Sequence, residues 1–309
     1  MKRELITIYI PTYNRRGKLI RTLQCLEKQT NQDFIVYIRD NYSEYSVDSV
    51  LDYIGSSFRE KVKIFQNERN YGADINIISV FRFPETKWVW LLSDDDYPAQ
   101  DAVEIIMRNI DEQGEEVAAF NYVTWDFVKS PKKKIQTFSK LENYLSYFKS
   151  LDMEERYLLQ LDLVYMSNKV LNLEIMKKYY TFGMNCKETA LGISIPIMKM
   201  LERQEGKYCI VRENIVRYSE TGFDCWNRLD ISWRTRKSAS VKFILQKEER
   251  ALLDEMLMMF PIKKIFELKK GKWNRRELQQ IKDIYKADFY RMSMLERLKY
   301  YMMIQGRKI

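Results

Sequence analysis

Histidine is absent from this chain of 309 residues. Its absence excludes a histidine general base, a Ser–His or Cys–His nucleophile system and a histidine-ligated metal. Any metal site must therefore rely on oxygen donors, which suit Mg²⁺ or Mn²⁺. Proton transfer falls to Asp, Glu, Lys or Tyr.

Cysteine is scarce, and long apolar runs are missing. The four cysteines are scattered and form no C-x-x-C pair, which predicts reduced thiols rather than a disulfide framework or a zinc site. No apolar stretch reaches the roughly 18 residues of a membrane-spanning helix. Residues 1–5 lead straight into a strand-like run, so we expect no signal peptide and a cytoplasmic protein.

Apolar patterning predicts an α/β fold. The chain is 46% apolar, enough to bury a sizeable core. Strands separated by helical patterns of 10–15 residues indicate βαβ units and a mainly parallel sheet flanked by helices. Right-handed crossovers then place the strand ends along one edge. We predict strands at 5–10, 33–39, 62–65, 88–93, 117–120, 161–168 and 209–218, and helices at 18–27, 47–58, 73–83 and 191–201.

Three consecutive carboxylates, Asp94, Asp95 and Asp96, directly follow the apolar run of residues 88–93. Like charges so close together repel one another unless a cation lies between them. Mg²⁺ takes oxygen ligands, usually one or two carboxylates plus substrate phosphates, and open α/β sheets bind ligands beyond the carboxyl ends of their strands. The triplet therefore predicts a metal–diphosphate site. The alternative is an acidic turn, or a cap for a helix starting near Ala99.

Polar loops also follow the earlier predicted strands. A nucleotide needs such a set: a carboxylate to accept from a base N–H, donors around the ribose and a metal on the diphosphate. Each loop taken singly also fits ordinary turn chemistry. The loops are residues 11–15 (Pro-Thr-Tyr-Asn-Arg), 40–43 (Asp-Asn-Tyr-Ser) and 67–72 (Asn-Glu-Arg-Asn-Tyr-Gly).

The order and spacing of these motifs over residues 5–125 resemble the family 2 inverting glycosyltransferases of the GT-A fold. The resemblance implies a Rossmann-like GT-A domain, a nucleotide-diphospho-sugar donor, most often UDP-linked, and Mg²⁺ or Mn²⁺. We expect a catalytic domain at 1–231, with nucleotide-sugar binding at 1–125, where the resemblance lies, and the acceptor side at 126–231. From about residue 232 the pattern becomes helical and basic, which predicts a separate C-terminal region at 232–309.

The resemblance also implies roles for individual residues. Asp40 would hydrogen-bond the base, Asp94 would face the ribose, and Asp95 or Asp96 would hold the metal. The family usually shows Asp-x-Asp, and Ser93 takes the place sometimes held by the first aspartate, which leaves the register open. The other residues implied to line the nucleotide-sugar site are Pro11, Thr12, Tyr13, Asn14, Arg15, Asn41, Asn67 and Asn70.

The base that would deprotonate the acceptor hydroxyl, giving inversion, is expected in the second half of the chain. Family members often place it in an acidic pair just before a helix, which points to Glu188. Here Thr189 replaces the second acid of the pair. The alternative is that Glu188 only favours the start of that helix electrostatically. Asp162 and Asp224 are the reserve candidates.

The net charge of +9 is concentrated in the tail. Residues 232–309 hold 20 basic and 9 acidic residues, a net of +11, whereas residues 1–231 hold 32 and 34. Basic segments with apolar faces suit an anionic membrane surface, and members of the family that extend bacterial surface polysaccharides act on lipid-diphosphate-linked acceptors. We therefore expect peripheral attachment at the inner face of the cell membrane. The alternative is a helical appendage packed on the catalytic domain.

Two other functions would fit parts of the sequence. A nucleic-acid-binding protein would explain the basic tail and the aromatic residues, but the first 231 residues are slightly acidic and carry no nucleic-acid motif. A nucleotidyltransferase would also need carboxylates, a metal and a nucleotide. That class usually has a glycine-rich phosphate loop after the first strand, where this chain has residues 11–15 instead. We therefore predict a glycosyltransferase with no nucleic-acid partner.

Overall fold

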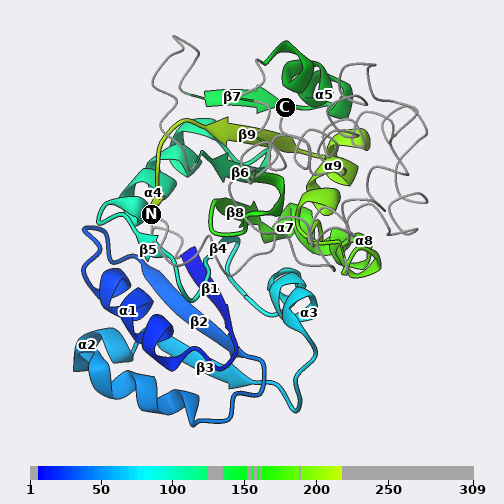
Figure 1. The fold of residues 1–309 in the computed structure, drawn as a ribbon. Coiled ribbons are helices and arrows are strands. Elements are labelled where there is room, and N and C mark those ends of the chain that lie inside the picture. The colour runs from blue at the N-terminus through cyan, green and yellow to red at the C-terminus, as the bar shows by residue number, and fades with distance from the viewer. Residues whose placement is uncertain are drawn as a thin grey trace, which may run out of the picture.

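The computed structural model describes residues 6–123, 135–151, 155, 159, 162–187 and 189–217. Within these residues eight strands form one mixed sheet, in the order β3-β2-β1-β4-β8-β6-β9-β7 (Figure 1). The strands are β1 (Ile6–Thr12), β2 (Phe34–Asp40), β3 (Val62–Gln66), β4 (Trp88–Leu91), β6 (Val117–Tyr122), β7 (Ile135–Phe138), β8 (Lys169–Asn172) and β9 (Lys207–Val211); β5 (Tyr97–Pro98) and β10 (Val216–Arg217) form a separate pair.

The predicted α/β architecture is confirmed. β3, β2, β1 and β4 are parallel neighbours, and β6 and β9 form a second parallel pair. β8 lies between β4 and β6 and is antiparallel to both, and the edge strand β7 is antiparallel to β9. The sheet is therefore mainly parallel, with one reversed strand at its centre and another at one edge.

Helices cover both faces of the sheet, as Figure 1 shows. Successive side chains of a strand point to opposite faces. Ile6, Ile8 and Ile10 of β1 accordingly pack with α1 and α4, whereas Tyr9 packs in the core on the other face. The helices are α1 (Arg16–Glu27), α2 (Ser56–Arg59), α3 (Ala73–Ile78), α4 (Ala102–Gln113), α5 (Leu141–Ser150), α7 (Leu173–Met176), α8 (Tyr180–Asn185) and α9 (Ser194–Glu202), with 3₁₀ turns η1 (Val47–Tyr53), η2 (Ser79–Phe81) and η3 (Lys177–Tyr179).

Four predicted elements were wrong in detail. One is the helix expected at 73–83, which is divided between α3 and η2. The strand expected at 161–168 is not one: residues 162–164 are helical, the chain then turns, and the strand is β8 at Lys169–Asn172. A short apolar run does not distinguish a strand from a buried helical turn. The strand expected at 209–218 is divided between β9 and β10, and the helix expected at 47–58 between η1 and α2.

The basic region 232–309 lies outside the described residues, so the proposed domain division stays a prediction. Among the helices that the structure does describe, none combines the length and the apolar character needed to cross a membrane.

Candidate functional site

The carboxyl ends of the first three strands lie side by side. Thr12, the last residue of β1, is in register with Asp40, the last of β2, and Asp40 is in register with Gln66, the last of β3. The triplet follows β4, the neighbour of β1 on its other side. The predicted polar loops therefore gather at one edge of the sheet.

Asp40 is fully buried and holds its own loop. Its carboxylate accepts hydrogen bonds from Ser43 Oγ at 2.5 Å, from the Ser43 backbone N–H at 3.0 Å and from Gln66 Nε2 at 2.8 Å. Ser43 Oγ in turn accepts from the Asn14 backbone N–H at 2.8 Å. The first two loops are thus joined. The predicted bond from Asp40 to a nucleobase stays a prediction.

Asn41 joins the second loop to the third. Its Oδ1 accepts from Asn67 Nδ2 at 2.9 Å and from the Tyr71 backbone N–H at 3.0 Å, while its Nδ2 donates to Asn70 Oδ1 at 2.8 Å. Gly72 follows with a φ of 88°, a left-handed conformation that favours glycine. Three asparagines from two loops therefore support one another at the rim.

Asp94 faces the first loop. Its carboxylate accepts from Thr12 Oγ1 at 2.7 Å and from Arg15 at 3.1 Å. Burial nevertheless raises the pKa of Asp94 to about 6, because the Arg15 charge and the Thr12 hydrogen bond offset only part of the desolvation.

Asp95 has the most cationic surroundings of the triplet. Although its partial burial acts in the opposite direction, the pKa of Asp95 is lowered by a hydrogen bond from Ser93 and by the charges of Arg15 and Lys18. Ser93 Oγ donates at 2.6 Å, and Arg15 and Lys18 lie at 3.0 and 3.1 Å. Asp95 is therefore the member of the triplet most firmly kept as an anion.

Asp96 turns away from these cations toward the second half of the chain. Its Oδ2 accepts from Tyr165 Oη and from Ser167 Oγ, both at 2.6 Å. Burial raises the pKa of Asp96 to about 6, the charges of Asp95 and Asp94 add to the rise, and the two hydroxyl donors oppose it. Both of these donors are neutral hydroxyls, whereas Asp94 and Asp95 accept hydrogen bonds from cations.

Helix α1 also holds the backbone of the triplet. Thr22 Oγ1 lies 3.0 Å from the Asp94 carbonyl oxygen and 3.2 Å from that of Asp96, and it donates toward both. Thr22 is fully buried. Arg15, Lys18 and Thr22 recur at intervals of three and four residues, so one face of the α1 region meets the triplet.

Of the three candidate bases, only Asp162 lies among the described residues. Glu188 and Asp224 lie outside the described residues, so their roles stay predictions. Asp162 is 1% exposed, and its carboxylate accepts from Asn168 Nδ2 at 2.9 Å and from Asn121 Nδ2 at 3.2 Å. These contacts within the fold do not favour a base that meets an acceptor from solution.

Four residues that sequence reasoning missed contact the triplet: Lys18, Thr22, Tyr165 and Ser167. The helical spacing from Arg15 to Lys18 and Thr22 could have revealed the first two. No local signal marks Tyr165 or Ser167, because their approach depends on β8 inserting next to β4.

The carboxylates suit a hard divalent cation. No group of three or more Asp, Glu or Cys side chains converges as a metal site in the part of the chain that the structure covers. Mg²⁺ needs only one or two protein carboxylates when a substrate diphosphate supplies further oxygens. Asp95, kept ionised and beside Asp96, meets that requirement.

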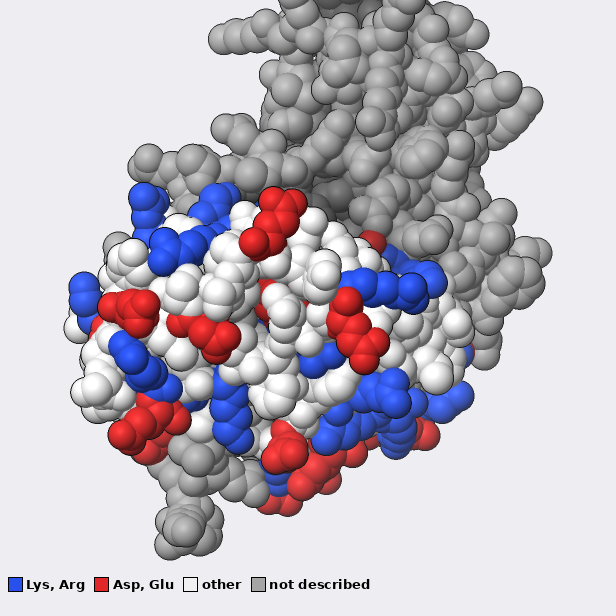
Figure 2. Space-filling view, turned by 90° about the horizontal axis from the view of Figure 1, so that it is seen from below, with Lys and Arg blue, Asp and Glu red and all other residues white. Residues whose placement is uncertain are grey.

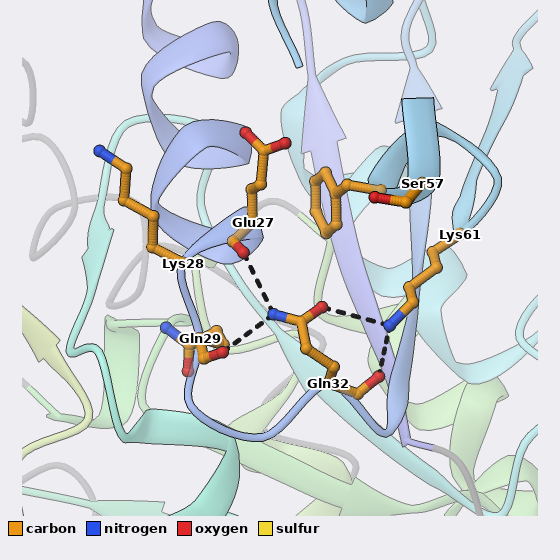
Figure 3. A pocket seen from close by; sticks show the side chains of 7 residues that line it. Glu27, Lys28, Gln29, Gln32, Ser57 and Lys61 are labelled. Carbon is orange, nitrogen blue, oxygen red and sulfur yellow. Dashed lines mark hydrogen bonds between the residues drawn. The ribbon is translucent and has the colours of Figure 1, made fainter. Parts of the chain in front are cut away.

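A separate hollow of about 430 Å³ lies near the amino ends of β2 and β3, away from the triplet (Figure 3). Its side chains bond mainly to nearby backbone and to one another. Gln32 Nε2 donates to the Glu27 and Gln29 carbonyls, and Lys61 Nζ donates to the Gln32 carbonyl at 2.7 Å. We assign no ligand to it.

Comparison with known proteins decides the family. The sequence profile described as "Glycosyl transferase family 2" matches residues 7–204, well over half of the chain. The chain belongs to glycosyl transferase family 2. This family, together with similar proteins named as glycosyltransferases, supports a role in glycosyl transfer.

Among individual proteins, this family 2 member is similar to the abequosyltransferase RfbV of Salmonella typhimurium. The two are 27% identical over 113 residues, which cover 36% of this chain and 34% of RfbV. The chain thus matches about a third of the length of this curated relative.

Two solved structures share the fold. The structure of S. aureus TarS residues 1–349 in complex with UDP-GlcNAc has a TM-score of 0.56 and 16% identity, covering 91% of this chain and 79% of that one. The mannosyltransferase PcManGT from Pyrobaculum calidifontis, in complex with GDP-Man and Mn²⁺, has a TM-score of 0.55 and 11% identity, covering 98% and 85%. The predicted resemblance to the GT-A fold is thereby confirmed.

Proposed function

We propose that this protein transfers a sugar from a nucleotide-diphospho-sugar, in the first instance a UDP-sugar, to a hydroxyl group of a glycan acceptor. The observation that carries the proposal is the arrangement of the triplet: carboxylates at the carboxyl edge of the sheet, with two partly exposed cations beside them. The complexes of TarS with UDP-GlcNAc and of PcManGT with GDP-Man support a donor of this class.

Arg15 and Lys18 have the chemistry to receive the diphosphate. Their side chains are 36% and 33% exposed, whereas Asp95 between them is 9% exposed. A diphosphate bound at this rim would share the two cations with Asp95, and the positive charges of Arg15 and Lys18 would balance the negative charge of the diphosphate. Arg15 presents a planar fork of N–H donors that matches phosphate geometry.

A divalent cation completes this proposal. Asp95 and Asp96 would hold Mg²⁺ or Mn²⁺, and the ion would supply positive charge to the departing nucleoside diphosphate. Asp94 would face the ribose, and Asp40 the base. The complex of PcManGT with Mn²⁺ supports a metal of this kind.

We further propose that Glu188 deprotonates the acceptor hydroxyl, on the face of the sugar opposite the leaving diphosphate, so that the anomeric centre inverts. Glu188→Gln should abolish transfer and leave donor binding unchanged, because only the proton acceptor is lost. Product release and donor affinity, measured on the same preparation, test this. Full activity of the variant would transfer the role to Asp224 or Asp162.

Donor class is tested by thermal stabilisation of the full chain. UDP or GDP with Mn²⁺ should raise the melting temperature, because a ligand that binds only the folded state stabilises it. ATP, CTP and a single-stranded oligonucleotide are the comparisons. Stabilisation by the oligonucleotide alone would reject the proposal. Screening sugar nucleotides by hydrolysis without acceptor would then identify the sugar.

The acceptor is proposed to be a lipid-diphosphate-linked glycan of a bacterial surface polysaccharide, reached from the cytoplasmic face of the membrane. The net charge of +11 on residues 232–309 supports this, since each Lys or Arg near an anionic surface contributes about 1 kcal/mol. The full chain should sediment with anionic vesicles at low salt and be released at high salt. Equal binding to neutral vesicles would contradict it.

The nucleic-acid alternative is not favoured. On the face seen in Figure 2, coloured Lys and Arg side chains are interspersed with Asp and Glu, and do not form one continuous basic surface. Binding of nucleic-acid phosphates requires a basic patch or stripe.

A further inference from the structure

Lys169 is a buried lysine that the proposed function leaves unused. It is the first residue of β8 and is 1% exposed. Its three N–H donors are shared among four acceptors: Asn121 Oδ1 and Asn168 Oδ1, both at 2.6 Å, the Tyr165 carbonyl at 3.1 Å and the Asp162 carbonyl. The ammonium is thus surrounded by acceptors inside the fold.

The same two asparagines connect Lys169 to a buried carboxylate. Each offers its Oδ1 to Lys169, and each donates its Nδ2 to Asp162, Asn168 at 2.9 Å and Asn121 at 3.2 Å. The opposite charges are therefore linked through two carboxamides in a closed ring. Burial lowers the pKa of Lys169, with the Asp162 carboxylate opposing the shift.

The burial of a cation at this position requires an explanation. Burying an ion pair costs several kcal/mol per ion, and an apolar pair of similar volume is often as stable. The reason lies in the backbone. Residues 162–168, here called the 162–168 loop, comprise a short helical segment at 162–164 and the turn that leads into β8, with residues 162, 163, 167 and 168 buried. Buried carbonyls must be paired, and Lys169 pairs those of Asp162 and Tyr165.

The 162–168 loop also contacts the edge of the sheet that carries the aspartate triplet. Besides donating to Asp96, Ser167 Oγ accepts from the Ser93 backbone N–H at 2.8 Å, and the Ser167 carbonyl accepts from Trp90 Nε1 at 2.8 Å. Tyr165, whose carbonyl Lys169 binds, donates its hydroxyl to Asp96. One short loop therefore joins the buried cation to the triplet.

We propose that Lys169 is a positioning residue: its buried cation fixes the 162–168 loop, and the loop in turn fixes the Asp96 carboxylate. The assignment rests on the proposed function only for the role of Asp96 as a metal ligand. The mechanical link from Lys169 through the loop to the triplet is a property of the fold, and it can be tested on the protein without metal or donor.

The first test is amide hydrogen exchange of the full-length chain, comparing Lys169→Met with the wild type. Without the cation, the loop should loosen and the Ser93 amide should lose its partner Ser167, so its exchange should quicken about 10-fold or more. Lys169→Met removes the buried positive charge opposite Asp162 and risks unfolding. The double variant Lys169→Met/Asp162→Asn removes both charges and restores charge balance.

Asn172→Ala is the matched control. Asn172 lies at the other end of β8, is equally buried, and donates to the Glu115 and Val117 carbonyls. Its loss should destabilise the protein but leave exchange at Ser93 near that of the wild type. Wild-type exchange at Ser93 in the folded double variant would overturn the proposal. So would failure of both Lys169 variants to fold, because Lys169 would then support the whole fold and not this loop.

The second test measures Mn²⁺ affinity in the presence of UDP. Partners that orient a metal ligand typically change metal affinity 10–100-fold. The double variant should therefore bind Mn²⁺ at least 10-fold more weakly, and Asn172→Ala should bind it like the wild type. If the wild type binds no Mn²⁺ with UDP, the metal proposal fails, and hydrogen exchange alone decides the role of Lys169.

Discussion

The two sides of the aspartate triplet differ in what they offer it. From the first half of the chain come Arg15 and Lys18, both about one-third exposed, which pair with Asp94 and Asp95. From the second half come Tyr165 and Ser167, neutral hydroxyls that hold Asp96, with Ser167 fully buried. One side supplies accessible charge and the other supplies buried hydrogen bonds.

This difference divides the contacts of the triplet into those that an incoming ligand can replace and those that hold the carboxylates in position. A partly exposed cation can move from a carboxylate to an incoming phosphate, since exposed ion pairs contribute little free energy. A buried hydroxyl cannot leave its partner without leaving a polar group unpaired. We infer that the first side meets the donor and that the second keeps the triplet in shape. The following variants test this division.

The largest effect is expected for Asp95→Asn. Loss of the anion beside Arg15 and Lys18 removes the proposed metal ligand, and sugar-nucleotide turnover should fall by about 10²–10³-fold. Because the pKa of Asp95 is lowered in the fold, its ionised form favours folding at neutral pH, and the variant should melt below the wild type. The loss should be small, because both cationic partners are partly exposed. Release of nucleoside diphosphate measures turnover, and Asp101→Asn on the exposed turn before α4 is the control. Near-normal turnover of Asp95→Asn would move the metal to another carboxylate.

Asp96→Asn should have the opposite effect on stability. An acid whose folded pKa is raised, here from 3.8 to about 6, binds its proton more tightly when folded. Its contribution therefore favours folding at low pH and is lost as the pH rises from about 4 to 6. Above pH 6 the wild type bears the full cost, about 3 kcal/mol from a shift of this size.

Thermal unfolding in EDTA tests this. Asp96→Asn should melt several degrees above the wild type at pH 7.5, and the gain should shrink to nothing near pH 4. Ser93→Ala, which removes the hydroxyl donor to Asp95 at the other side of the triplet, should show no such pH-dependent gain. A variant that melts below the wild type at every pH would contradict the conclusion that the buried charge of Asp96 destabilises the fold.

The same division between the two halves of the chain explains which parts of the site could be predicted from the sequence. In the first half, each polar loop follows its own strand, and parallel strands end at one edge, so the gathering of Thr12, Asp40 and Asp94 could be predicted. The order of strands and loops along the chain was enough for that prediction. The strands from β1 to β4 lie within a few residues of their predicted positions.

The second half could not be predicted in the same way. Its contribution depends on β8, which enters antiparallel between β4 and β6 although it lies 47 residues beyond the end of β6. The apolar pattern favoured a strand at 161–168, where the chain instead turns so that Lys169 can bind its carbonyls. Tertiary contacts between segments distant in sequence overrode the local signal.

A moderate effect is expected for Arg15→Gln. Removing this cation should weaken binding of UDP with Mn²⁺ about 10-fold, the value of one charge-assisted phosphate contact. Isothermal titration measures the affinity. Arg59→Gln, on α2, is the matched control, because Arg59 contacts the Leu51 carbonyl at 2.9 Å and the exposed Asp52 at 3.9 Å, and not the triplet. Unchanged affinity in Arg15→Gln would remove the donor-binding role of the cationic side.

The smallest effect is expected for Thr22→Val, which keeps the shape of the side chain and removes its hydroxyl. The carbonyls of Asp94 and Asp96 lose their shared donor, and unfolding free energy should fall by about 1–2 kcal/mol. Thr22→Ser retains the donor and should recover most of this loss in urea denaturation. Turnover should fall less than in Asp95→Asn, because Thr22 holds backbone and not the reacting groups. Equal instability of the Val and Ser variants would show that the methyl group matters there, and the hydroxyl does not.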